Sequence, residues 1–166
     1  MRPPGSALQA SARRFGLIAL LSTAAVCAAL VSQHAFGMEP CPWCVLQRLV
    51  FVAIASAALV GFAWRTKSGQ GIAGVLLTLL ALAGMAAALW QHFRAAKSAS
   101  CNLTLADNIL NATTLPSVLP DVFEPRASCA DAAVNLLGAP YEFWSLGLFM
   151  VIAVAAVSIL LRPRRG

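Results

Sequence analysis

Four of the five cysteines fall into two pairs of different spacing, so thiol chemistry is the first function that the sequence indicates. Cys41 and Cys44 enclose Pro-Trp, which is the two-residue spacing of thiol–disulfide oxidoreductase sites. Such a motif can lower the pKa of a thiol, and the thiolate is the nucleophile of disulfide exchange. Cys101 and Cys129 are separated by a long loop. We therefore expect cysteines that cycle between thiol and disulfide.

Metal binding and structural disulfides are the alternatives to redox chemistry for these cysteines. A closed zinc site typically takes two closely spaced ligand pairs, whereas Cys101 and Cys129 lie far apart and His34 and His92 are not spaced as a ligand pair, so no metal is expected. Disulfides that merely staple the loop stay an open alternative. Cys27, inside an apolar stretch, is expected to be a small apolar packing residue.

Arg48 follows Cys44 by four residues, which places both side chains on one face of a helix, one turn apart. Cys44 falls at the expected start of that helix, where free amide groups and the helix dipole favour a thiolate. A charge just inside a membrane is costly and is a functional candidate, although an arginine can also snorkel to the interface. We expect Arg48 to stabilise negative charge on the Cys44 sulfur or on a bound acceptor.

The elements that hold these residues are membrane-spanning helices. The chain of 166 residues is 60% hydrophobic and 11% charged, well above the roughly 45–50% apolar content of soluble domains. Four apolar stretches, at about residues 15–33, 45–64, 71–90 and 143–161, are long enough to cross a bilayer. We predict an all-α membrane protein, a single four-transmembrane-helix bundle over residues 1–166 that is embedded in the lipid bilayer. A cleaved signal peptide is the alternative interpretation of the first stretch, but its apolar run is longer than is usual for one.

The charges predict the orientation of the bundle. Basic residues cluster in three places, before the first stretch, between the second and third, and after the fourth, which marks these segments as cytoplasmic. All six acidic residues lie in the other two connections, at about residues 34–44 and 91–142, which are then periplasmic. The net charge of +6 is thereby explained as a topology signal, and no nucleic-acid partner is expected.

The second periplasmic loop cannot be one continuous helix, because Pro116, Pro120 and Pro125 interrupt it. We expect it to be mobile. Within it a short amphipathic segment is predicted, which either rests on the membrane surface or packs on the bundle. Its apolar residues are Leu115, Val118, Leu119, Val122 and Phe123.

The whole pattern resembles the DsbB family of bacterial inner membranes. The resemblance rests on four predicted helices with both chain ends in the cytoplasm, on Gln33-His34 ahead of Pro40-Cys41-x-x-Cys44, on Arg48, and on Cys101 with Cys129 in the second loop. The segment 119–123 and the residues Pro140 and Trp144 are also similar to the family's. Gln47 and the Pro-Trp between the cysteines are departures that should tune the redox potential.

The resemblance implies that a periplasmic thioredoxin-fold protein like DsbA is reoxidised here and that a membrane quinone, ubiquinone or menaquinone, receives the electrons. The route from DsbA through DsbB to quinone is known to keep the bacterial periplasm oxidising. By position, the resemblance implies that the partner attacks the disulfide of Cys101 and Cys129 through Cys101. Exchange with Cys41 and Cys44 follows, and Cys44 delivers the electrons to the quinone beside Arg48. His92 corresponds to a family histidine that could assist the quinone or a proton.

Two alternative functions fit the same residues. One is an oxidase of the same kind that serves a different thioredoxin-like partner. The other is a membrane protein whose periplasmic disulfides are only structural.

Overall fold

The computed structural model describes residues 4–95, 105–136 and 138–161, and it describes side chains from residue 9 onward. Its four long helices are α1 (Pro4–Phe36), α2 (Pro42–Ala63), α3 (Lys67–Phe93) and α7 (Tyr141–Leu160). Between α3 and α7 lie three short helices, α4 (Leu105–Ala112), α5 (Leu115–Val118) and α6 (Pro120–Phe123). A small antiparallel pair follows, in which β1 (Asn135–Leu136) lies against β2 (Ala139–Pro140).

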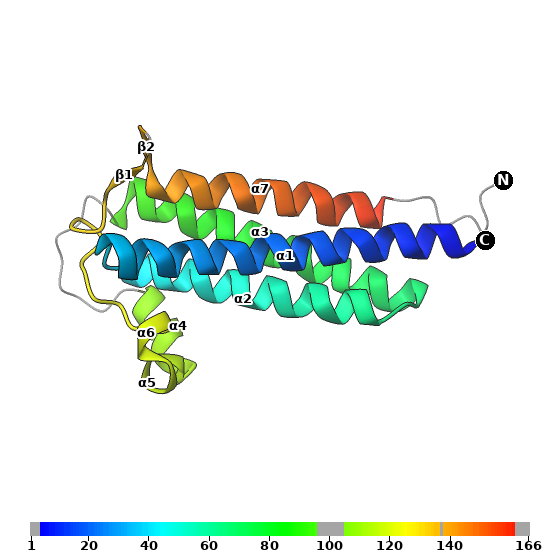
Figure 1. Cartoon of the computed structure of the whole chain (residues 1–166), viewed down its shortest axis with the longest axis horizontal. Helices are drawn as coiled ribbons and strands as arrows, with labels where there is room; N and C mark the ends of the chain where they lie inside the picture. The colour runs from blue at the N-terminus through cyan, green and yellow to red at the C-terminus, as the bar shows by residue number, and fades with distance from the viewer. Residues whose placement is uncertain (1–3, 96–104, 137, 162–166) are drawn as a thin grey trace.

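The four long helices pack as an elongated bundle (Figure 1). Helix α1 packs on α2, α2 on α3 and α3 on α7, while α1 and α7 share a smaller contact. Each helix is long and apolar enough to cross a membrane. Their outward faces expose large apolar side chains, among them Leu20, Leu79 and Val154, which suit a lipid environment. The predicted four-helix membrane bundle is confirmed, and the chain is a multi-pass membrane protein.

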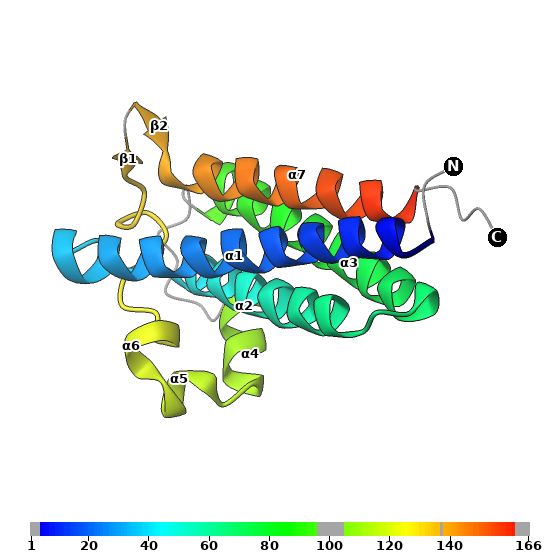
Figure 2. The ribbon, with the colours of Figure 1, turned by 45° about the vertical axis from the view of Figure 1, so that its right-hand side comes forward.

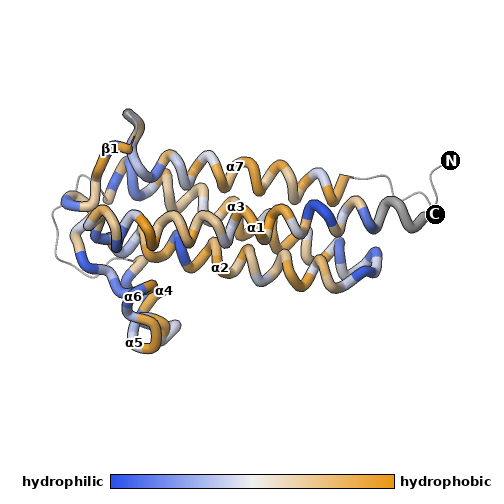
Figure 3. Tube along the Cα trace, in the orientation of Figure 1, coloured by the Kyte–Doolittle hydropathy of each residue, from blue (hydrophilic) through white to orange (hydrophobic). Residues whose placement is uncertain are grey.

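Polar residues gather toward the two ends of the bundle, and apolar residues line its length (Figure 3). At one end of the bundle α1 begins, α7 finishes and α2 connects to α3 (Figure 1). The three short helices α4, α5 and α6 and both strands lie at the opposite end (Figure 1). The side of the membrane that each end faces stays a prediction.

Local sequence explains where two of the helices begin. Cys41 is the N-cap of α2: its backbone is extended, its sulfur accepts a hydrogen bond from the Cys44 amide at 3.3 Å, and Pro42 follows at the first helical position. Thr66 caps α3 in the same way, since its hydroxyl accepts from the Gly69 amide at 3.1 Å. The start of α2 thus fixes the backbone of the Cys-Pro-Trp-Cys motif.

The centre of the bundle is closed by aromatic packing against a glycine. The rings of Phe51 and Phe149 stack with centroids 4.1 Å apart, and Phe149 is fully buried. A Cβ atom on Gly84 would lie only 2.4 Å from the Phe149 ring, so α3 and α7 can approach this closely only with glycine at that position.

The predicted amphipathic segment is two short helices instead of one. The break falls at Leu119, because Pro120 has no amide hydrogen to continue α5. Phe123 is buried against Val45 and Leu110, so this residue of the segment packs on the bundle and does not rest on the membrane surface. Val118 stays exposed, and its contact with the membrane surface stays a prediction. Figures 1 and 2 place α4, α5 and α6 beside the start of α2.

Candidate active site

The two cysteines of the short motif lie at the start of α2, at the end of the bundle that carries the short helices. The sulfurs of Cys41 and Cys44 are 2.8 Å apart, and both residues are thiols in the structure. Cys41 is fully buried, whereas Cys44 is partly exposed. Trp43, between them, is buried too and lies 6.3 Å from Trp90 between ring centroids.

Cys129 lies beside this motif although it is distant in the sequence. The amides of Arg126 and Ala127 both donate to the carbonyl oxygen of Pro40, at 2.9 and 3.3 Å, and so attach the second loop to the residue before Cys41. Cys129 is buried in the same cluster as Cys41, and their side chains share a hydrogen bond. Cys101, the remaining cysteine of the proposed relay, lies outside the described residues.

The sulfurs of Cys41 and Cys129 differ in their tendency to ionise. The hydrogen bond from Cys41 lowers the pKa of the Cys129 thiol below its ordinary 9.0; burial opposes this shift, and the Trp43 amide adds to it. The pKa of Cys41 is raised, first by its hydrogen bond with Cys129, then by its hydrogen bond with Cys44, and also by burial. In the reduced state, therefore, Cys41 keeps its proton and Cys129 is the better nucleophile of the two.

Two glutamines support the Cys44 sulfur. Gln91 of α3 donates its Nε2–H to Cys44 Sγ at 3.2 Å, and its Oε1 accepts a hydrogen bond from Gln47 Nε2 at 2.6 Å. Both glutamines are nearly fully buried, at 3% and 4% exposure. Because a donated hydrogen bond favours the charged form of its acceptor, this chain favours a thiolate at Cys44.

Arg48 is buried one turn below Cys44 and joins three segments. Its Nη1 donates to Gln33 Oε1 at 2.6 Å and to the Val122 carbonyl at 3.2 Å, and its Nη2 donates to the Ala29 carbonyl at 3.3 Å. None of these acceptors carries a formal charge, and Arg48 makes no ion pair among the described residues. The guanidinium thus brings a positive charge close to Cys44.

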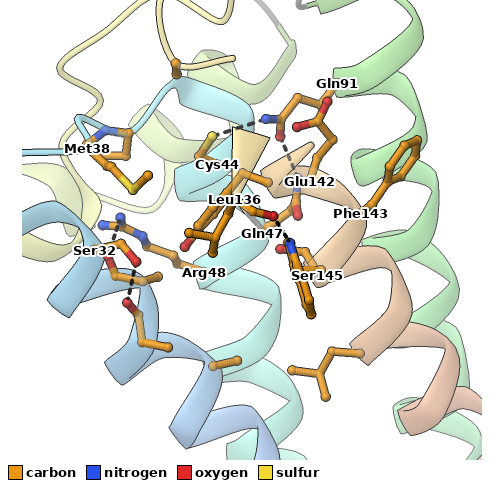
Figure 4. A pocket seen from close by; sticks show the side chains of 18 of the residues that line it. Ser32, Met38, Cys44, Gln47, Arg48, Gln91, Leu136, Glu142, Phe143 and Ser145 are labelled. Carbon is orange, nitrogen blue, oxygen red and sulfur yellow. Dashed lines mark hydrogen bonds between the residues drawn. The ribbon is translucent and has the colours of Figure 1, made fainter. Parts of the chain in front are cut away.

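A cavity of about 640 Å³ opens beside Cys44, between α1 and α7 (Figure 4). Its apolar walls come mainly from alanines of α1 and from Phe51, Leu148 and Val151. Polar groups lie at the end near the cysteines: Cys44, Gln47, Arg48, Gln91 and Glu142. Largely apolar walls with a few clustered polar groups are what binding sites for small amphipathic molecules offer.

His92 does not line the cavity. Its Nδ1 lies 2.7 Å from Oε1 of Glu142, which does line it. The ring of His92 packs against Phe93 and Phe143. His92 therefore reaches the cavity through the carboxyl group of Glu142.

The structure brings Cys41, Cys44 and Cys129 together, with Arg48 one turn away, and it adds Gln91 and Glu142, which sequence reasoning missed. Glu142 had a signal, since an acidic residue at the start of an apolar stretch is unusual. Cys27 is exposed on α1, so the expectation that it packs in the bundle is wrong. Within the described part of the chain, no group of His, Cys, Asp and Glu could hold a metal ion.

Comparison with known proteins gives this arrangement a context. The family model for disulfide bond formation protein DsbB matches residues 11–159. This chain belongs to the DsbB family. It is 36% identical over 151 residues to disulfide bond formation protein B of Aromatoleum aromaticum, an alignment that covers 86% of this chain and 90% of the relative. It is 32% identical over 163 residues to the protein of that name from Cupriavidus metallidurans, covering 95% and 98%.

Disulfide bond formation protein B 1 of Pseudomonas savastanoi is 32% identical over 152 residues, covering 90% of this chain and 89% of that relative. Membership of the DsbB family makes this chain a thiol oxidoreductase of disulfide bond formation.

Proposed function

We propose that this protein reoxidises a soluble thioredoxin-fold dithiol protein of the DsbA type and passes the electrons to a membrane quinone, ubiquinone or menaquinone. The observation that carries the proposal is the position of Cys41, which contacts Cys44 on one side and Cys129 on the other. Disulfide exchange requires three sulfurs in contact, because the attacking thiolate displaces the leaving one at the central sulfur.

The first exchange takes place in the second loop. A thiolate of the partner attacks Cys101 in the Cys101–Cys129 disulfide, forms a mixed disulfide and releases Cys129 as a thiolate. Cys41 is part of a disulfide at this stage and has no S–H to donate. The Trp43 amide, whose hydrogen bond also lowers the pKa of Cys129, therefore stabilises the leaving thiolate, and thiols of low pKa leave faster.

The second exchange links the loop to α2. The Cys129 thiolate attacks Cys41 in the Cys41–Cys44 disulfide and releases Cys44 as a thiolate, beside the Gln91 amide and Arg48. The second thiol of the partner then resolves the mixed disulfide, and the partner leaves oxidised. The Cys101 thiolate that is released attacks Cys129 in the Cys41–Cys129 disulfide, which restores the Cys101–Cys129 disulfide and releases Cys41. Cys41 and Cys44 are left reduced, so two electrons have moved from the partner to α2.

The cavity fits a quinone head group by its chemistry. An aromatic ring with two carbonyl oxygens needs apolar walls and a few hydrogen-bond donors, which the alanines of α1 and the group of Gln47, Arg48 and Gln91 supply. A quinone bound here would take up two electrons and two protons as Cys41 and Cys44 return to the disulfide. Arg48 would bind this quinone and the Cys44 sulfur would face it, and His92 would assist it through its contact with Glu142.

For the membrane, we propose the bacterial inner membrane with the cysteine end facing the periplasm. Four of the described basic residues, Arg13, Arg14, Arg65 and Lys67, lie in segments at the opposite end of the bundle and support this orientation. Arg94 and Arg126 lie at the cysteine end, where acidic residues outnumber them.

The test is quinone reduction by purified protein that is given the reduced thioredoxin-fold partner and a short-chain ubiquinone. We expect turnover by the wild type and by Cys27→Ser, whose cysteine is exposed on α1 away from the site. We expect none by Cys44→Ser or Cys101→Ser. Turnover that survives both substitutions would leave the cysteines with a structural role and overturn the proposal, and a mixed disulfide of Cys101 with a protein of another kind would identify a different partner.

A further inference from the structure

Glu142 is a buried carboxyl group in the wall of the cavity. It lies in the first turn of α7 and is only 4% exposed. A carboxyl group out of contact with water at the edge of a membrane is energetically costly, and such groups are functional candidates. Figure 4 shows its side chain among those that line the cavity, near Gln91.

The partner of Glu142 connects it to the outside. Nδ1 of His92 lies 2.7 Å from Oε1 of Glu142, and the His92 side chain is 30% exposed against 5% for that of Glu142. The pair thus forms a chain of two proton-carrying groups, with one end accessible to water and the other in the cavity wall.

The other polar groups around the cavity are poorer proton donors. Gln47 and Gln91 are amides, and Arg48 donates hydrogen bonds to Gln33, Val122 and Ala29. Cys44 is consumed when the disulfide forms. Tyr141, the neighbour of Glu142, also lines the cavity, but a phenol is a weaker acid than a carboxylic acid.

One other carboxyl group belongs to the described lining, that of Glu39, and it is exposed to solvent. Glu142 is therefore the buried carboxyl group of this wall.

We propose that Glu142 is the proton donor of the cavity and that His92 is the group that reprotonates it. The inference rests on the proposed function, because it assigns the source of one of the two protons that accompany the two electrons. The Glu142 carboxylic acid gives its proton to the nearer carbonyl oxygen of the quinone and becomes a carboxylate, while the second proton of the quinol comes from the Cys41 thiol, which loses it as the disulfide forms. The Nδ1 proton of His92 then moves to Oε1 of Glu142, and solvent returns a proton to the imidazole ring.

A purely structural role is the alternative, since an acidic residue in the first turn stabilises a helix and the bond to His92 ties α3 to α7. Glu142→Gln separates the two roles. Glutamine can still accept the hydrogen bond from His92 and fills the same space, but it cannot release a proton.

The experiment compares the wild type with Glu142→Gln, Glu142→Asp and the exposed control Glu124→Gln. Each reduced protein is mixed with a short-chain ubiquinone in a single turnover, and loss of quinone absorbance is followed. General acid catalysis contributes about 10²–10⁴-fold, so we expect quinol formation to slow by about 10²-fold or more in Glu142→Gln. We expect partial recovery in Glu142→Asp, no change in Glu124→Gln, and an unchanged rate of thiol exchange with the partner throughout.

A second readout does not depend on turnover. The infrared spectrum of the quinone-free protein should show the C=O band of a buried carboxylic acid in the wild type, and Glu142→Gln should lack this band. A wild-type rate in Glu142→Gln, a loss in Glu39→Gln in its place, or a wild-type spectrum without this band would each overturn the relay. Should Glu142→Gln fail to fold, the wild-type spectrum still decides. If the wild type itself reduces no quinone, the proposed function fails and the relay fails with it.

Discussion

Replacing Gln91 by methionine removes the hydrogen bond to the Cys44 sulfur while nearly keeping the volume of the side chain. The bond matters mainly in the reduced state, because a thiolate is a much better acceptor than a disulfide sulfur. Gln91 is 3% exposed and its Nε2 is 3.2 Å from Cys44 Sγ, so water cannot easily replace the donor. The substitution should therefore destabilise the reduced form of the Cys41–Cys44 pair.

The size of the effect follows from two general values. A hydrogen bond to a charged group contributes about 1.5–3 kcal/mol, and about 1.4 kcal/mol corresponds to 30 mV for a two-electron couple. We expect the reduction potential of the Cys41–Cys44 pair to fall by about 30–60 mV in Gln91→Met.

The assay uses quinone-free protein in which Cys101 and Cys129 are replaced by serine. The protein is equilibrated in thiol–disulfide buffers, free thiols are alkylated, and the oxidised fraction is measured by mass spectrometry. The control is Gln70→Met, which alters another buried glutamine of α3 near the opposite end of that helix. A potential unchanged within about 10 mV, or one that rises, would refute the idea that Gln91 stabilises the Cys44 thiolate.

Three further predictions concern other residues of the site and the bundle. Alkylation of Cys129 in the reduced protein should stay fast below pH 9.0, because its lowered pKa keeps the thiolate as the pH falls. Cys41→Ala should move the inflection of the alkylation rate to higher pH, since it removes the hydrogen bond that lowers this pKa. An inflection at or above pH 9.0 in the wild type would contradict the lowered pKa of Cys129. Arg48→Lys keeps the charge but loses the bonds that join Gln33, Val122 and Ala29, so we expect weaker quinone binding in equilibrium titrations, and an unchanged affinity would argue against a role at the cavity. Gly84→Ala should reduce the free energy of unfolding in detergent by about 1–3 kcal/mol, because its Cβ would overlap the buried Phe149 ring, whereas Gly147→Ala meets nothing within 4 Å and serves as the control.

The sequence predicted best what depends on neighbouring residues. The start of α2 and the closeness of Cys41 to Cys44 follow from Pro42 and the two-residue spacing, and the four long helices follow from apolar length. Arg48 lies one turn below Cys44 because helix geometry places every fourth residue on the same face.

Contacts between distant segments could not be predicted in this way. Cys129 reaches Cys41 through the backbone bonds of Arg126 and Ala127 to Pro40, and nothing in the spacing of 85 residues from Cys44 to Cys129 encodes them. Gln91 and Glu142 belong to helices α3 and α7, and their roles appear only once these helices pack around the cavity. Pro120 implies the break between α5 and α6, whereas the amphipathic spacing alone favours one continuous segment.

The most direct test of the relay is whether Cys41 and Cys129 can form a disulfide with each other. In a variant with serine at positions 27, 44 and 101, these two cysteines are the only ones left. Mild oxidation with oxidised glutathione followed by peptide mapping should give an intramolecular Cys41–Cys129 disulfide, because the two side chains share a hydrogen bond in the folded protein. If both thiols instead stay reduced or join only between molecules, the transfer of electrons from the second loop to α2 through Cys129 is contradicted.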